Sequence, residues 1–157
     1  MIRNTFQKYV DKLEPVTQAL LKSRSWMIRE GLPPNVPKAG VYLFSDGSKP
    51  LYVGRSYNIR RRMGLHTRPS AAHNQATFAF RLTKERLGIG KPSYQTKGSR
   101  PDLAASPRFA HAFRKSKDTI RSLNVRFIEE NDAVMQALLE IYIAVTLGTP
   151  YNEFKTT

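Results

Sequence analysis

The chain has 157 residues, and its hydrophobic fraction of 40% is sufficient for one compact domain and excludes disorder throughout. Its 26 Lys and Arg residues outnumber 12 Asp and Glu residues, and the resulting net charge of +14 favours a polyanionic partner such as nucleic acid. The lack of cysteine excludes disulfides and thiolate metal sites, and no apolar run reaches the roughly 20 residues that a membrane span needs.

The first 36 residues predict a helical extension followed by a linker. Apolar residues recur in steps of three or four from Phe6 to Leu20, which indicates one helix face, and Pro15 predicts a kink or a division into two short helices. The three prolines of Gly31–Pro37 predict a stiff extended linker, and we expect Trp26 to pack between this region and the following domain. The N-terminus has no apolar stretch typical of a signal peptide, so we expect a cytoplasmic protein.

The next segment predicts a β-hairpin and a basic helix. An apolar strand, Gly40–Phe44, is followed by turn residues Ser45–Ser48 and by a second strand, Pro50–Val53. Ser56 or Asn58 then provides the cap of a basic helix that continues to Met63.

The rest of the chain predicts further strands and helices in alternation. We expect a strand at Thr77–Leu82, a basic glycine-rich loop at Lys84–Arg100, a helix that begins at Ser106–Pro107, a strand at Leu123–Ile128, and an apolar helix from an Asn131 cap to Leu147. The predicted fold class is α/β (α+β), with a small mixed or antiparallel sheet of three to four strands flanked by helices. The predicted domain spans residues 37–157 and contains a basic insertion at about 83–122.

Five spaced elements in this order resemble the GIY-YIG nuclease family over residues Lys38 to Phe154. They are Gly40-Val41-Tyr42, Tyr52-Val53-Gly54, Arg62 with His66 four positions later, Glu140, and Pro150-Tyr151-Asn152. Valine replaces both motif isoleucines, which keeps a β-branched strand residue, and Arg55 stands where family members commonly carry Lys, Ser or Gln.

The resemblance implies a metal-dependent DNA endonuclease. Glu140 offers a hard oxygen ligand suited to one Mg²⁺ or Mn²⁺ per active site, and Arg62 offers a planar positive group for the scissile phosphate. Tyr42, Tyr52 and His66 are candidates for moving the proton of the attacking water, and the choice between the two tyrosines stays open. Asn152 is expected to orient the site through its amide.

Basic residues near this set predict contacts with DNA. We expect Arg55, Arg60, Lys84 and Arg86 to bind the nucleic acid. Lys84 and Arg86 lie at the start of the basic insertion, which we expect to recognise the target. Two partners are thus expected, DNA and, for double-strand cutting, a second copy of the chain, with no membrane partner.

Taken alone, each site residue has an ordinary structural interpretation, such as sheet packing for a tyrosine or a solvated face for an arginine. Glu140 is the exception, because a carboxylate inside an apolar helix is costly unless it is paired, exposed or metal-bound. The joint occurrence favours an endonuclease, restriction-like, homing-like or defence-related. The alternatives are a structure-specific repair or recombination nuclease and a catalytically idle module that only binds nucleic acid.

Overall fold

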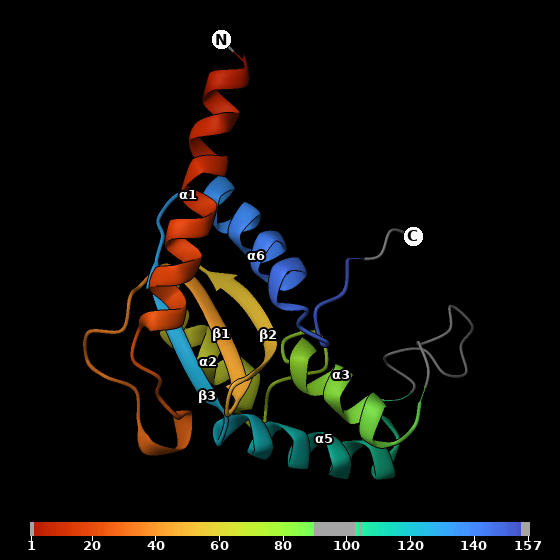
Figure 1. Cartoon of the computed structure of the whole chain (residues 1–157). Helices are drawn as coiled ribbons and strands as arrows, with labels where there is room; N and C mark the ends of the chain where they lie inside the picture. The colour runs from red at the N-terminus through yellow and green to blue at the C-terminus, as the bar shows by residue number, and fades with distance from the viewer. Residues whose placement is uncertain (1, 90–102, 104, 155–157) are drawn as a thin grey trace. The chain divides into compact units, whose positions relative to one another are not determined.

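An antiparallel sheet of strand order β2-β1-β3 organises the computed structural model, which describes residues 2–89, 103 and 105–154 (Figure 1). Strands β1 (Gly40–Asp46) and β2 (Lys49–Ser56) form the predicted hairpin, closed by a two-residue loop in which Gly47 adopts a φ of +58°. Strand β3 (Asn124–Glu129) pairs with the other edge of β1. The predicted α/β class with a small antiparallel sheet is therefore confirmed.

The predicted strand at Thr77–Leu82 is wrong, because this segment is the start of helix α3 (Thr77–Arg86). Its short apolar stretch satisfies both the strand and the helix period, so periodicity alone does not decide between them. The residues that follow, Lys84 to Arg86, are good helix formers. The helix buries side chains around most of its circumference, namely those of Phe78, Ala79, Phe80, Leu82, Thr83 and Lys84.

Helices α1 (Ile2–Lys22) and α6 (Ala133–Leu147) cover one face of the sheet and form its apolar core. This core contains Leu20 of α1, Val41 and Leu43 of β1, Val53 of β2, and Met135, Leu139, Ile143 and Ala144 of α6. Helix α1 continues through the exposed Pro15 as one helix, so the predicted alternative of two short helices is excluded. Packing of the turns on both sides of the proline stabilises the helix despite the hydrogen bond that proline cannot donate.

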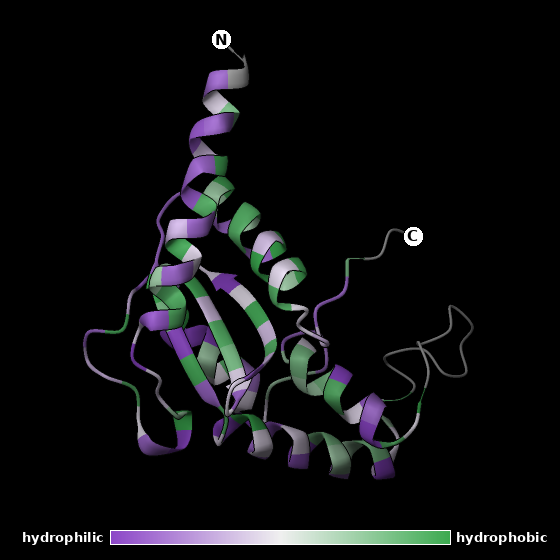
Figure 2. Cartoon of the chain, viewed as in Figure 1, coloured by the Kyte–Doolittle hydropathy of each residue, from purple (hydrophilic) through white to green (hydrophobic). Residues whose placement is uncertain are grey.

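Helix α6 is apolar on almost every side, as Figure 2 shows by its green colour. Its cap is Asp132, whose Oδ1 accepts a hydrogen bond from the Met135 amide at 2.9 Å. The predicted cap, Asn131, is therefore wrong by one residue. Gly148 ends the helix in a left-handed conformation with a φ of +66°, as the sequence predicts.

The described chain divides into two compact units, one of residues 1–62 and 123–157 and one of residues 63–122. The first contains the sheet, α1, α6 and the short helix η1 (Ile28–Glu30), so residues 1–36 belong to the same unit as the sheet. In the second unit α3 packs against α5 (Pro107–Arg121) through Phe80, Phe109 and Phe113. Helix α2 (Ile59–Thr67) contains the boundary between the units. None of the helices among the described residues has the length and apolarity to cross a membrane.

Candidate active site

A cavity of about 280 Å³ lies in the first unit, between the β1–β2 hairpin, the start of α2 and α6. Its walls carry hydroxyl, guanidinium, amide and carboxylate groups. They come from Tyr42, Tyr52, Gly54, Arg55, Ser56, Tyr57, Arg62, Gln136 and Glu140. Residues separated by almost one hundred positions in the sequence thus share one polar pocket, which we call the tyrosine pocket.

Tyr42 lies at the base of this pocket and is 1% exposed. In the sheet it stands opposite Gly54 of β2, and its ring covers that glycine. A Cβ atom at Gly54 would lie 2.2 Å from the Tyr42 hydroxyl oxygen, so no larger residue fits without moving the ring. The glycine of the Tyr52-Val53-Gly54 motif therefore makes room for the tyrosine of the first motif.

Arg62 reaches Tyr42 from the first turns of α2. Its Nε donates a hydrogen bond to the Tyr42 hydroxyl oxygen at 3.3 Å, and its side chain is half-buried. The start of the helix is fixed by Asn58, whose Oδ1 accepts from the Arg61 amide at 3.1 Å, and by the Ile59 amide, which donates to the Lys38 carbonyl at 2.8 Å. Asn58 is thus the helix cap, while Ser56 accepts from the amide of Asn58.

Burial controls the ionisation of Tyr42. It raises the pKa of the Tyr42 phenol well above its ordinary value of 10, and neighbouring Tyr52 raises it further, whereas Arg62 acts in the opposite direction. Tyr42 is therefore protonated at neutral pH. Because its oxygen accepts the hydrogen bond from Arg62, its own hydrogen is directed elsewhere.

Glu140 enters the pocket from α6 with a side chain that is 26% exposed. The Arg55 Nε lies 3.7 Å from its Oε2, and the Arg55 side chain is 43% exposed, so the carboxylate faces a cation at the solvent side. Partial exposure and this ion pair account for a charge on an otherwise apolar helix.

Three residues that line the pocket, Ser56, Tyr57 and Gln136, are not among the predicted site residues. Gln136 is 1% exposed and donates a hydrogen bond from Nε2 to the Glu130 carbonyl at 2.6 Å. It precedes Glu140 by four positions, so helix periodicity placed it on the same face and could have identified it. Tyr57 is 60% exposed at the pocket, and nothing in the sequence separates it from an ordinary surface residue.

The donors of the pocket fit a hard divalent cation. Glu140 is the carboxylate among the lining residues, and the oxygens nearby are hydroxyls and an amide. Within the described part of the chain, no three His, Asp or Glu side chains gather as a metal-binding group. A single carboxylate suits Mg²⁺ or Mn²⁺, which retains most of its water ligands.

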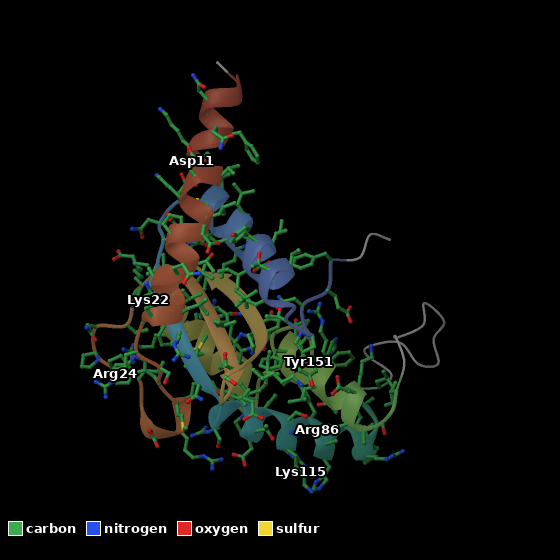
Figure 3. The ribbon with its side chains drawn as sticks, viewed as in Figure 1. Asp11, Lys22, Arg24, Arg86, Lys115 and Tyr151 are labelled. Carbon is green, nitrogen blue, oxygen red and sulfur yellow. The ribbon has the colours of Figure 1, made fainter. Side chains whose placement is uncertain are left out.

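Asn152 supports the pocket from outside it. Its Oδ1 accepts from the Val53 amide at 2.9 Å, and its Nδ2 donates to the Val53 carbonyl at 2.8 Å. Thr149 also donates to this Oδ1 at 2.7 Å, and the Tyr151 amide donates to the Leu51 carbonyl at 3.2 Å. Because β2 is an edge strand, these bonds satisfy backbone groups that the sheet leaves unpaired. We call residues 149–152 the β2 clasp; Tyr151 of this segment is labelled in Figure 3.

His66 lies on the same helix as Arg62, because α2 continues through Gly64 to Thr67. It belongs to the second unit, is fully buried, and makes an edge-to-face contact with Phe78 at a centroid distance of 6.4 Å. His66 is not among the residues that line the tyrosine pocket.

The expected DNA-binding residues differ in exposure. Arg55 and Arg60 are exposed, although Arg60 donates from Nη2 to the Pro33 carbonyl at 2.6 Å. In α3, Arg86 is exposed (labelled in Figure 3), whereas Lys84 is only 8% exposed, with its Nζ 5.9 Å from the centre of the Phe80 ring. The remaining basic residues of the predicted loop, Lys91, Lys97 and Arg100, lie outside the described residues.

Five of the predicted site residues thus line one pocket, namely Tyr42, Tyr52, Arg55, Arg62 and Glu140. Asn152 holds the strand that carries Tyr52 and Arg55. Comparisons with models of protein families, with curated proteins and with solved structures give no match for this chain. The function is therefore inferred from the pocket itself.

Proposed function

We propose that this protein is a metal-dependent endonuclease of the GIY-YIG type that hydrolyses phosphodiester bonds of DNA. The observation that carries the proposal is the convergence of two tyrosines, an arginine and a partly exposed carboxylate in one cavity. Each side chain comes from a different element, β1, β2, α2 and α6. Local packing does not require these groups to meet, whereas phosphodiester hydrolysis uses all of them.

Arg62 is the group for the scissile phosphate. Its Nε donates to Tyr42, and Tyr52 is a second hydrogen-bond partner of the guanidinium, so the two tyrosines fix its plane in the pocket. A planar guanidinium contacts two phosphate oxygens at once, so it both positions the phosphate and stabilises the charge that develops in the transition state.

The two tyrosines receive different roles. Tyr42 is protonated and accepts from Arg62, so its hydroxyl donates a hydrogen bond to a phosphate oxygen. A group that holds its proton so firmly does not accept one from water at neutral pH. We therefore assign proton acceptance to Tyr52, which also lines the pocket: as a phenolate, with its charge offset by Arg62 and by a cation held at Glu140, it would take the proton of the attacking water.

Glu140 is the residue that would hold one Mg²⁺ or Mn²⁺. A cation bound there would offset negative charge on the phosphate and favour ionisation of a water molecule. Arg55 lies beside the same carboxylate and is exposed, so it can turn from Glu140 to the DNA backbone when the carboxylate has another partner.

Two other functions compete with this proposal. A structure-specific repair or recombination nuclease would use the same pocket and differ only in the DNA that it accepts. An idle module that only binds nucleic acid would have no use for Glu140 beside the tyrosines. The expected restriction-like or defence role and the homodimer for double-strand cutting also remain parts of the proposal, because one such pocket cuts one strand at a time.

The decisive experiment is cleavage of supercoiled plasmid, single-stranded DNA and branched DNA by the full chain in Mg²⁺, in Mn²⁺ and in EDTA. We expect nicked or linear plasmid in either metal, and no product in EDTA. Glu140→Ala should abolish cleavage while it retains DNA binding, since most affinity comes from the positive charge of the protein. Glu129→Ala removes an exposed carboxylate from the end of β3 and is the matched control.

The outcomes separate the three functions. Cleavage of branched DNA alone would favour the structure-specific nuclease, and binding of every DNA without any cleavage would favour the idle module. Equal cleavage by wild type and Glu140→Ala would remove the carboxylate from the mechanism. Binding of Mn²⁺, followed by electron paramagnetic resonance, tests the ligand independently of turnover and should be weakened in Glu140→Ala but not in Glu129→Ala.

A further inference from the structure

A second cavity, of about 440 Å³, lies in the first unit where the chain between α1 and β1 runs beside β3. It shares no lining residue with the tyrosine pocket. We call it the Trp26 pocket, and it is lined by Ser23, Arg24, Trp26, Pro33, Asn35, Val36, Pro37 and Phe127. Arg24 is labelled in Figure 3 beside this segment.

Two aromatic residues, Trp26 and Phe127, line the Trp26 pocket together with two prolines. The Arg24 guanidinium carbon lies 4.1 Å from the centre of the indole. Asn35 and Ser23 add hydrogen-bonding groups at the rim. Flat apolar walls with a stacked guanidinium and an amide suit a planar heterocycle with polar edges, the chemistry of a nucleobase.

The pocket is held in place by hydrogen bonds on both sides. Trp26 forms an isolated bridge with Val125 at the edge of β3, with two backbone hydrogen bonds of 2.8 Å. Arg126 donates from Nε to the Ser23 carbonyl at 2.9 Å, and Arg60 donates to the Pro33 carbonyl at 2.6 Å. These bonds fix both walls, so the cavity exists before any ligand binds, and ordering costs on binding are small.

The register of the sheet relates the two pockets to one face, with the Trp26 pocket beside β3 and the tyrosine pocket beside β2. Phe127 of β3 stands directly opposite Tyr42 of β1, and directly opposed residues of antiparallel strands point to the same face. That face is opposite to the one that Val41 and Leu43 turn toward α1 and α6.

The charge around the Trp26 pocket complements the DNA backbone. Residues 22–38 contain four cations, Lys22, Arg24, Arg29 and Lys38, and one anion, Glu30. The exposed Arg60 and the half-buried Arg126 contact the walls from outside this segment. Stacking walls surrounded by positive charge are the combination found in sites for unpaired nucleic acid.

We propose that the Trp26 pocket binds an unpaired or splayed-out base of the DNA whose phosphate is held by Arg62. The identity of the substrate rests on the proposed function, but the pocket and its test do not require cleavage. The N-terminal segment of residues 23–37 would then be a substrate-binding part of the enzyme as well as a connector.

The fluorescence of Trp26 tests this proposal directly, because it is the only tryptophan of the chain. The full chain in EDTA is titrated with a single-stranded DNA oligonucleotide and with a strand of equal length whose positions are all abasic. Both strands should bind by charge, as followed by anisotropy of a label on the DNA. We expect only the strand with bases to quench or shift the tryptophan emission. Equal emission changes with both strands, or none with either while both bind, would overturn the proposal.

Substitutions give the same test in affinities. Trp26→Ala should reduce the preference for the strand with bases over the abasic strand by roughly 5- to 150-fold, the usual effect of losing one stacked base. Arg24→Ala should reduce the same preference, whereas the matched control Arg29→Ala removes an exposed arginine of η1 that does not line the pocket. If Trp26→Ala does not fold, Arg24→Ala and the titration of wild type decide the question. Equal preferences in Arg24→Ala and Arg29→Ala would count against the pocket.

Failure of the pocket and failure of the nuclease proposal remain distinguishable. Base-dependent quenching in a chain that cuts no DNA would support the pocket and reject the nuclease. Cleavage that depends on Glu140, together with emission that is indifferent to bases, would support the nuclease and assign Trp26 to structural packing alone.

Discussion

Tyr42 and Tyr52 are both buried, at 1% and 8% exposure, and both line the tyrosine pocket. Tyr42 is fixed between Gly54 and Arg62, and burial raises the pKa of its phenol, so the role we propose for it is that of a hydrogen-bond donor. Tyr52 lines the same pocket and is the proposed proton acceptor. The spacing of the two motifs does not contain this distinction, which depends on what covers each hydroxyl group.

We predict that Tyr42→Phe and Tyr52→Phe both fold and both lose activity, for different reasons. Loss of a hydrogen-bond donor to the phosphate in Tyr42→Phe should lower the cleavage rate by about 10²–10³-fold. Loss of the proton acceptor in Tyr52→Phe should lower it by about 10²–10⁴-fold and remove the rise of the rate with pH, which Tyr42→Phe should retain. Single-turnover rates across pH and melting temperatures provide the measurement.

Tyr57→Phe is the matched control for these variants, because Tyr57 is largely exposed at the same pocket. It should cleave DNA at close to the wild-type rate. Wild-type rates in all three variants would remove tyrosine from the mechanism.

The raised pKa of Tyr42 also predicts how stability depends on pH. The folded state keeps the Tyr42 proton above pH 10, where the unfolded state loses it. The contribution of Tyr42 to the free energy of unfolding is therefore complete below pH 10 and declines above it. The free energy of unfolding of wild type should fall by about 1.4 kcal/mol more per pH unit above pH 10 than that of Tyr42→Phe. Urea denaturation at several values between pH 8 and pH 11 measures this difference.

Tyr9 and Tyr142 do not disturb this comparison. Their pKa values are also raised, by hydrogen bonds to Asp132 and Glu14 respectively, but both residues are present in the two proteins compared. Parallel curves for wild type and Tyr42→Phe above pH 10 would contradict the burial of an unionised Tyr42.

At the scale of elements, the hairpin positions the pocket through the close approach of Tyr42 to Gly54. Gly54→Ala introduces a methyl group 2.2 Å from the Tyr42 hydroxyl oxygen and 2.3 Å from the ring carbon that carries it. Both atoms belong to a rigid aromatic group, which does not bend aside as the end of a flexible side chain does. We expect a loss of stability of about 1–3 kcal/mol, typical of overpacking, and a larger loss of cleavage because the hydroxyl is displaced. Chemical denaturation and single-turnover cleavage measure the two effects.

Gly64→Ala is the control for that substitution. A Cβ atom at Gly64 in α2 meets only the end of the Arg68 side chain, which can rotate away. Alanine also favours the helix, so this variant should be as stable as wild type or more stable by about 0.5–1 kcal/mol. Equal stability of the two alanine variants would mean that the Tyr42 ring does not depend on Gly54.

The β2 clasp is the second element that determines the pocket. Asn152→Asp keeps the size of the side chain but places an oxygen where the amide now donates to the Val53 carbonyl. We expect Asn152→Asp to be at least as destabilising as Asn152→Ala, by about 1–3 kcal/mol, because it sets two acceptors against each other. Melting temperatures and hydrogen exchange of the Val53 amide provide the measurement, and Asn35→Asp outside the clasp serves as control. Wild-type stability in Asn152→Asp would show that the clasp does not hold β2.

At the scale of the whole molecule, the charge of +14 predicts salt-dependent binding of DNA. The affinity of Glu140→Ala for duplex DNA should fall by about 10³-fold or more between 50 and 200 mM salt, the effect of releasing six or more phosphate counterions. Fluorescence anisotropy measures the affinity without cleavage. An affinity independent of salt would mean that the excess of Lys and Arg serves another purpose than binding to phosphates.

The sequence by itself determined the features that depend on neighbouring residues and on spacing. The hairpin follows from its alternating strands and Gly47, and the last helix follows from its apolar composition and its stop at Gly148. The choice of Glu140 also followed from the sequence, since a carboxylate in an apolar helix is costly unless it is paired, exposed or bound to a metal. Net charge, a sum over residues, needs no structure at all.

Only the tertiary structure decided the features that depend on contacts between distant segments. Thr77–Leu82 satisfies two periods, and packing against α5 together with the residues that follow selects the helix. Tyr42 becomes a firmly protonated donor because Gly54 and Arg62 enclose it, and Asn152 becomes a clasp because β2 is an edge strand. The Trp26 pocket likewise exists because β3, far along the chain, pairs beside Trp26. Pairings across a hundred residues are set by the fold as a whole, and local propensity does not encode them.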